Sequence, residues 1–131
     1  MKRANRLAFL LIIMLALVSC GKSDGTLTST GADATFVANS YQTLDVAGKS
    51  VDTAMKSIAM LYKAGQFSEA NKAMAVSAAN QFKLSYDSAV DALLLYSTTP
   101  TAANKSAVTA ALVNVGVQVA AVVALNIVTA K

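Results

Sequence analysis

The chain offers few side chains that could do chemistry. Its 131 residues include one cysteine, Cys20, and no histidine. One cysteine cannot form an intramolecular disulfide. Without histidine the chain cannot build a Cys/His zinc site or the Ser–His or Cys–His pair of a nucleophilic enzyme. The sequence also has no P-loop and no nucleophile elbow. We therefore predict that the protein is not an enzyme and uses no cofactor or metal.

Residues 1–19 have the features of a secretory signal. Lys2, Arg3 and Arg6 place positive charge ahead of a twelve-residue apolar run, 7–18. A positive n-region, a short apolar h-region and a small residue at the cleavage point make up such a signal. The alternative is an uncleaved membrane anchor, but a spanning helix needs about 20 apolar residues.

The end of this run, Leu17-Val18-Ser19-Cys20, resembles the lipobox of bacterial lipoproteins. The resemblance covers only the leader and the cysteine. It implies a diacylglyceryl thioether on the Cys20 sulfur and signal cleavage between Ser19 and Cys20. The new amino group is often acylated as well, with a fatty acid such as palmitate. A thiol is the best side-chain nucleophile for taking up an alkyl chain, and small flanking residues let a peptidase reach the backbone.

The lipobox resemblance implies a protein anchored in a bacterial cell envelope. One acyl chain binds a membrane marginally, whereas two or more anchor a protein stably, at about 0.8 kcal/mol per buried methylene. Enteric lipoproteins kept in the inner membrane typically have Asp after the cysteine, and this chain has Gly21 there. We therefore expect the outer membrane, with the protein facing the periplasm, if the source has two membranes.

The net charge of +4 comes largely from the predicted signal. Once residues 1–19 are removed from the 131, 112 remain, enough for one domain with a modest core. These 112 residues hold eight Lys, seven acidic residues and no Arg. Nucleic-acid binding needs a clustered basic face, so we do not expect it. The expected partners are membrane lipid, through acylated Cys20, and a protein, either an unidentified one or a second copy.

Residues 20–35 are predicted to be the lipidated cysteine and a flexible linker. The stretch is rich in Gly, Ser and Thr, and Leu27 is its one sizeable apolar residue. Fifteen such residues have a root-mean-square reach of about 5–6 Å × √15, or roughly 20 Å. This reach would let the following domain stand clear of the lipid headgroups.

Helical periodicity predicts a first helix over about residues 35–64. Apolar side chains recur at alternating spacings of four and three, as in a heptad seam. The i,i+4 pairs Asp45–Lys49 and Asp52–Lys56 support its outer face. The seam consists of Val37, Tyr41, Leu44, Gly48, Val51, Met55, Ile58 and Tyr62.

Two glycines mark special positions in this region. Gly48 interrupts the seam, and we expect a neighbouring helix to approach closely there. Gly65 is predicted to close the first helix as its C′ residue. Ser68 is predicted to cap a second helix over about 68–97, with Glu69 in its first turn. The short loop requires an antiparallel hairpin. The second seam consists of Ala75, Ala79, Phe82, Tyr86, Ala89, Leu93 and Tyr96.

The third segment, about 100–130, is predicted to begin with Pro100 at position N1 after a Thr99 cap. It carries no charge from Ala107 to Ala130, and three interpretations compete. As a core helix, it has Asn114, Gln118 and Thr129 together on one side. Its buried seam would then consist of Val108, Leu112, Val115, Val119 and Val122.

The other two interpretations are a strand and a membrane span. Alternating valines from Val113 to Val119 favour a strand. The 24-residue length suffices to span a bilayer, and Gly116 and Ala120 are spaced as in small-residue membrane packing. We favour the core helix, because the two preceding helices already offer an apolar groove of matched length. The predicted fold is therefore all-α, a three-helix antiparallel up-down-up bundle over residues 36–131 that resembles no specific family.

One acidic pair could form a site within the bundle. Asp87 and Asp91 lie one turn apart and could be half of a metal site or an acid/base pair. Carboxylate catalysis needs an enclosed, perturbed pair. Lys83 and the neighbouring serines instead suit a solvated face, which we favour.

Tyrosine and methionine side chains could form a binding surface. The tyrosines could line a ligand pocket, but their seam positions favour core residues with hydroxyls at the edge. Methionines could give an adaptable binding surface, although Met55 fits as seam filler. The residues concerned are Tyr41, Tyr62, Tyr86, Tyr96, Met55, Met60 and Met74.

The function that we expect is a small, non-enzymatic, lipid-anchored envelope protein. It would present its helical bundle to a protein partner or serve as a structural element. One alternative is a membrane-active lipoprotein of the lysis or entry-exclusion type that inserts the uncharged residues 107–130 into a bilayer. Another is a carrier of small apolar ligands inside the bundle.

Overall fold

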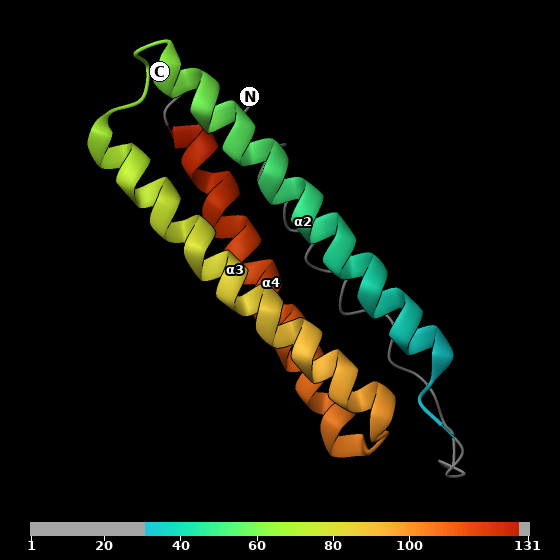
Figure 1. Cartoon of the computed structure of the whole chain (residues 1–131). Coiled ribbons are helices and arrows are strands. Elements are labelled where there is room, and N and C mark those ends of the chain that lie inside the picture. The colour runs from blue at the N-terminus through green and yellow to red at the C-terminus, as the bar shows by residue number, and fades with distance from the viewer. Residues whose placement is uncertain (1–30, 129–131) are drawn as a thin grey trace, which may run out of the picture. The chain divides into compact units, whose positions relative to one another are not determined.

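Three long helices make up the described part of the protein. The computed structural model describes residues 31–128, with side chains as far as residue 126, so Ser19 and Cys20 lie outside the described residues. The helices run up, down and up side by side (Figure 1). This arrangement confirms the predicted all-α three-helix antiparallel bundle. The helices are α2 (Ala34–Lys63), α3 (Glu69–Thr98) and α4 (Ala102–Val128).

The turn between α2 and α3 has the predicted glycine geometry. Gly65 has a φ of +71°, in the left-handed region. The N–H groups of Gly65 and Gln66 donate to the carbonyls of Tyr62 and Leu61, at 3.0 and 2.9 Å. These two bonds satisfy carbonyls that the helix end leaves free, as in a Schellman motif. The prediction that Gly65 closes the first helix is confirmed.

The predicted N-cap of α3 is confirmed, and the predicted N-cap of α4 is wrong. Ser68 caps α3 as predicted. The prediction that Pro100 occupies N1 after a Thr99 cap is wrong. Thr99 is the C-cap of α3, and the Thr101 hydroxyl instead accepts from the Asn104 N–H at 3.1 Å, so that α4 begins at Ala102.

The core is centred on α4. This helix contacts both α2 and α3, which contact each other less. Val108, Val115 and Val122, one every seven residues, are almost completely buried. They pack in one cluster with Leu44 of α2 and Leu93 of α3. The core-helix interpretation of the third segment is therefore confirmed, and the strand interpretation is wrong.

The predicted seam of α2 is confirmed at Leu44, Val51 and Ile58, and small side chains take the place of the larger predicted members Tyr41 and Met55. Ser40, Ala47 and Ala54 are buried, whereas Tyr41 is 45% exposed and Met55 is half-buried. Small side chains alternate with Leu44, Val51 and Ile58 on the face of α2 that contacts the other two helices. The Ser40 hydroxyl is satisfied by donating to the Phe36 carbonyl at 2.8 Å, so its burial leaves no polar group unpaired.

Gly48 does not mark the close helix approach that the sequence suggested. A methyl group built at Gly48 would find its nearest neighbour, Cε2 of Tyr86, at 3.9 Å, an ordinary van der Waals distance. The glycine therefore leaves room for alanine and costs the helix conformational entropy.

We predict that Gly48→Ala stabilises the bundle by about 0.5–1 kcal/mol, because alanine restricts the unfolded chain without clashing in the folded one. Gly65→Ala is the matched control. It should destabilise by about 1–2 kcal/mol, since an L-residue is strained in the left-handed region. Urea unfolding followed by circular dichroism measures both changes. A loss of stability in Gly48→Ala would show that the helices are closer than described.

We predict that Leu93→Ala destabilises the bundle by about 2–5 kcal/mol, because it leaves a cavity where no side-chain surface is exposed. Leu94→Ala is the matched control, since Leu94 is 50% exposed and should cost less than about 1 kcal/mol. The same unfolding experiment compares them. Equal effects would contradict the assignment of the core face of α3.

Candidate functional site

The point where the chain enters the bundle brings together side chains from all three helices. Asp33 precedes α2 as its N-cap, and its carboxylate accepts from the Phe36 N–H at 3.0 Å. The same carboxylate forms an ion pair with the Lys105 ammonium of α4, at 3.1 Å. The Asp33 N–H donates to the Tyr96 hydroxyl of α3, at 3.2 Å. We call these four residues the junction cluster.

Aromatic contacts complete the junction cluster. The rings of Phe36 and Tyr96 meet edge to face, with centroids 5.4 Å apart and an angle of 83°. The Lys105 ammonium lies 4.7 Å from the centroid of the Phe36 ring. Each of the four side chains therefore contacts a side chain of another helix. The position of the Lys105 ammonium beside the Phe36 ring adds a cation–π attraction to the ion pair with Asp33.

The electrostatics of the junction cluster favour an ionised Asp33. The Phe36 N–H and then the Lys105 ammonium hold the pKa of this carboxyl below its ordinary value of 3.8. Asp33 remains charged at neutral pH, and it also lies at the positive end of the α2 dipole. The arrangement binds and orients the start of α2 and contains no nucleophile–base pair.

Sequence reasoning did not find the junction cluster. It placed residues up to 35 in the linker, whereas Asp33 is a helix cap. One available signal was an Asp directly before a helical pattern, which is typical of an N-cap. The contacts with Tyr96 and Lys105 span 63 and 72 residues, and nothing in local spacing indicates such pairings.

The acidic pair on α3 does not form a site. Asp87 is exposed and pairs with Lys83 one turn away. Asp91 is exposed as well. Within residues 31–128 no group of three or more Cys, His, Asp or Glu side chains is placed to hold a metal ion. The solvated face favoured from the sequence agrees with this exposure.

The tyrosines are spread over the bundle and do not line one pocket. Tyr96 is buried and Tyr41 is exposed. Tyr86 is half-buried and packs against Phe82, with ring centroids 5.7 Å apart. Tyr62 lies at the opposite end of α2 from the junction cluster. Of the methionines, Met55 is half-buried against the core, and Met60 and Met74 are exposed.

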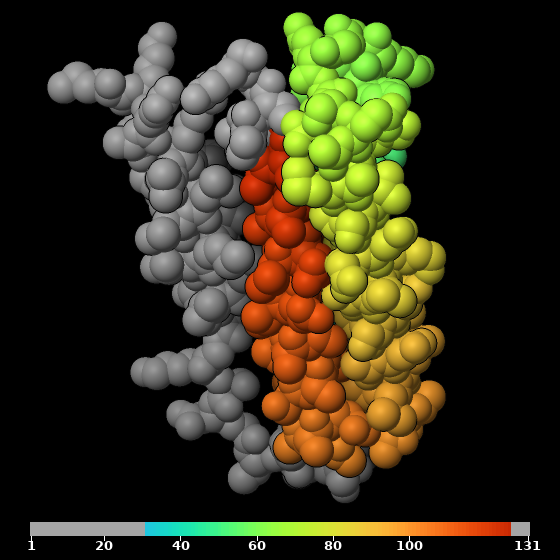
Figure 2. All heavy atoms as spheres, turned by 90° about the vertical axis from the view of Figure 1, so that its left-hand side faces the viewer, coloured from blue at the N-terminus to red at the C-terminus, as the bar shows by residue number. Residues whose placement is uncertain are grey.

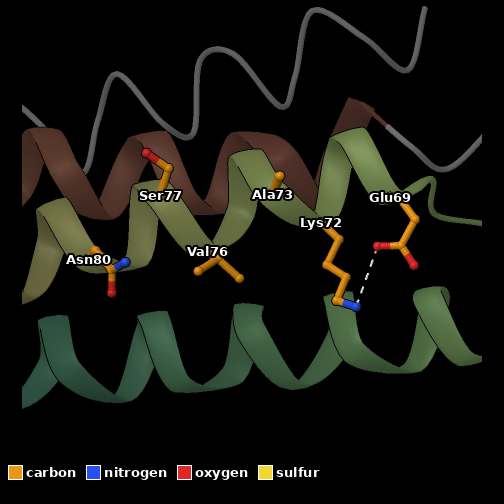
Figure 3. Close-up of a pocket in the computed structure, with 6 residues that line it drawn as sticks. All are labelled: Glu69, Lys72, Ala73, Val76, Ser77 and Asn80. Atoms are coloured by element: carbon orange, nitrogen blue, oxygen red, sulfur yellow. Dashed lines mark hydrogen bonds and ion pairs between the residues drawn. The ribbon is translucent and has the colours of Figure 1, made fainter.

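A shallow hollow lies along α3 beside α2. Figure 3 shows Lys72, Val76 and Asn80 pointing toward α2, with Glu69 hydrogen-bonded to Lys72. The Lys72 ammonium lies 4.2 Å from the Tyr62 ring centroid. All the lining residues belong to one helix, so this is an open surface and not an enclosed chamber. The lining consists of Glu69, Lys72, Ala73, Val76, Ser77 and Asn80.

The charges in this hollow neutralise one another. The Tyr62 hydroxyl hydrogen-bonds to Glu69, which lowers the pKa of that carboxyl. Contact with Tyr62, and then the charge of Glu69, raises the pKa of Lys72. Both groups thus stay ionised as a satisfied surface pair at neutral pH, with no free charge for a ligand.

A second hollow lies near the C-terminal end of α4. Its lining joins α2 and the following turn to Asn126 of α4, and Met60 at its edge is 65% exposed. It too is open to solvent. Neither hollow provides an enclosed apolar space for a small ligand, so the carrier alternative gains no support from these surfaces. The lining consists of Ser57, Met60, Leu61, Ala64, Gln66 and Asn126.

Comparison with known proteins adds no relative. No protein-family model, curated protein or solved structure matches the chain. Function must therefore be argued from the residues themselves.

We predict that Asp33→Asn lowers the melting temperature at pH 6, because Asn still caps α2 but cannot pair with Lys105. The folded pKa of Asp33 is depressed, so its contribution is present above the unfolded pKa and lost as pH falls through the folded one. The difference from wild type should therefore shrink below about pH 4. Thermal unfolding from pH 2 to 7 measures it.

Two variants control this experiment. Asp33→Ala removes the cap as well and should lower the melting temperature further, at low pH too. Asp45→Asn removes one exposed i,i+4 ion pair and should lower the melting temperature less than Asp33→Asn does. If Asp33→Asn matched wild type at pH 6, the ion pair with Lys105 would not contribute to stability.

Proposed function

We propose that the protein is a small, non-enzymatic lipoprotein of the bacterial cell envelope, anchored through acylated Cys20. The observation that carries the proposal is the sequence Leu17-Val18-Ser19-Cys20 behind a positively charged leader. Gly21 in place of an aspartate favours the outer membrane, with the bundle in the periplasm. The helical bundle then acts as a structural element or presents a surface to a protein partner.

The described part of the chain supports a binding or structural role. Several charged side chains are paired on the surface, as in Asp45–Lys49, Asp52–Lys56 and the junction cluster. No buried side-chain polar atom within residues 31–126 lacks a hydrogen-bond partner. Enzymes keep perturbed or unsatisfied groups in enclosed sites, and the satisfied groups of this bundle are typical of a scaffold.

We predict that Cys20→Ala abolishes labelling by a fatty-acid analogue and removes the protein from the lipid-anchored membrane fraction, because alanine has no sulfur to alkylate. Ser29→Ala, in the predicted linker, is the matched control and should leave both unchanged. Metabolic labelling followed by membrane fractionation measures the two effects. Persistent labelling of Cys20→Ala would exclude the proposal.

A membrane-active role is the second candidate, and one observation favours it. Within residues 31–128, α4 is the one helix long and apolar enough to cross a membrane, with a mean hydropathy of 2.1 over its most apolar window, of which 17% is buried. Asn114 and Gln118 oppose insertion, because amide side chains are costly in lipid. A variant that begins at Gly21 discriminates the two roles: partition into detergent would favour insertion, and retention in the aqueous phase would exclude it.

A further inference from the structure

Helix α2 is held less extensively than the other two helices. The contact between α3 and α4 exceeds the contacts that α2 makes with both of them taken together. Figure 2 shows α3 and α4 side by side along their length. Near the middle of both helices, the Asn114 side chain also donates a hydrogen bond to the Ser85 hydroxyl, at 3.1 Å. The hairpin of α3 and α4 is therefore the more extensively packed part of the bundle.

Polar side chains join α2 to its neighbours at both of its ends. At the first end, the junction cluster joins Asp33 to α3 and α4. At the other end, the Tyr62 hydroxyl hydrogen-bonds to Glu69, and the Tyr62 ring contacts the Lys72 ammonium. Between the two ends, buried apolar side chains hold the helix. They are Leu44, Ala47, Val51, Ala54 and Ile58.

The sequence of α2 contains residues that weaken a helix. Gly48, near its middle, costs conformational entropy. Five hydroxyl side chains within α2 donate to the carbonyl four residues earlier, and such side chains compete with the helix for its backbone groups. Helix α2 therefore depends on its contacts with α3 and α4 to remain helical. The five residues are Ser40, Thr43, Ser50, Thr53 and Ser57.

Separation of α2 is the opening of the bundle that breaks the least contact. Separation of α3 or of α4 would also break the extensive contact between these two helices, which separation of α2 leaves intact. Proteins open in cooperative units, and a unit with fewer buried contacts opens at a lower free energy than the whole domain. The hydrogen bond between Asn114 and Ser85 belongs to the part that stays closed.

We propose that α2 is a releasable strap, which opens as a unit from a hairpin of α3 and α4 that stays paired. The polar contacts of Asp33 and Tyr62, at the two ends of α2, set how often the strap opens. Each opening exposes the apolar surface of α3 and α4 that α2 covers. The strap is a property of the bundle alone and does not depend on the lipid anchor.

Hydrogen exchange of the full-length protein, resolved to single amides by mass spectrometry with fragmentation, tests the strap. Val51, Ala89 and Val115 are matched probes, because each is buried and lies in the middle part of its helix. After correction for intrinsic exchange rates, Val51 should exchange about tenfold or more faster than the other two. Equal protection at the three positions would show that the bundle opens all at once, and it would overturn the proposal.

A variant of the contact that stays closed gives the sharper test. Asn114→Ala removes the hydrogen bond to Ser85, which is intact whether the strap is closed or open. Exchange at Ala89 and Val115 should therefore become about two- to tenfold faster, the usual contribution of one hydrogen bond. Exchange at Val51 should not change. A bundle without a strap would show the same acceleration at all three positions, which would contradict the proposal.

Variants of the end contacts test what holds the strap closed. Asp33→Asn removes the ion pair with Lys105 and should make exchange at Val51 about two- to fivefold faster. Tyr62→Phe, at the other end, should act in the same direction. Asp87→Asn is the matched control, because its ion pair lies within α3, and it should leave exchange at Val51 unchanged. Equal exchange in all three variants would exclude a role for the end contacts.

Low concentrations of urea distinguish opening of the whole strap from fraying of its ends. If α2 opens as a unit, the amides of Leu44, Val51 and Ile58 share one protection and one dependence on urea. This dependence should be weaker than that of Ala89 and Val115, because opening of α2 exposes less surface than complete unfolding. Protection that rises steadily from the ends of α2 toward its middle would indicate fraying and would rule out the strap.

Discussion

The packing of one face of α4 against α2 and α3 is the contact on which the bundle depends. Val108, Val115 and Val122 supply it, one side chain every seven residues. Since α2 and α3 contact each other less than either contacts α4, removal of this helix would leave two helices with little shared surface. Apart from Phe67, Phe82 and Tyr96, the core consists of small and branched side chains. Each of these contributes modestly, so the total stability depends on the length of the helices. Helices of 30, 30 and 27 residues provide that length.

The same constraint explains the composition of the chain. A helix that must fit between two others needs short side chains on more than one face, and alanine and valine meet that need. Apart from Asp33 and Lys105 of the junction cluster, charge within residues 31–126 lies on α2 and α3, where i,i+4 pairs such as Asp45–Lys49 form. The uncharged third segment is thus compatible with a packed helix and needs no membrane to account for its place in the fold. The exposed Val113 and Val117 are the part of this helix that packing within the bundle does not explain.

Sequence patterns predicted the fold well where the cause was local. The spacing of apolar residues predicted the helices, and Gly65 and Ser68 predicted the turn between the first two. The predicted seam of α4 included the three buried valines Val108, Val115 and Val122. The α2 seam was correct at Leu44, Val51 and Ile58. It was wrong at Tyr41 and Met55, which are apolar by type, because Ser40 and Ala54 are small enough to face a neighbouring helix. The junction cluster was missed because Asp33 meets Tyr96 and Lys105 only after the chain has folded back twice. The role of Cys20 rests on its neighbours in sequence alone and stays a prediction.

The junction cluster has a mechanical consequence for a chain held by its N-terminal end. A pull transmitted along the backbone reaches Asp33 before it reaches any helix. There the N–H group is held by Tyr96 of α3 and the carboxylate by Lys105 of α4. The force on Asp33 is therefore shared among three helices. Separating α2 from the bundle requires breaking the hydrogen bond to Tyr96 and the ion pair with Lys105 together. A pull on residue 33 would thus strain the bundle as one body.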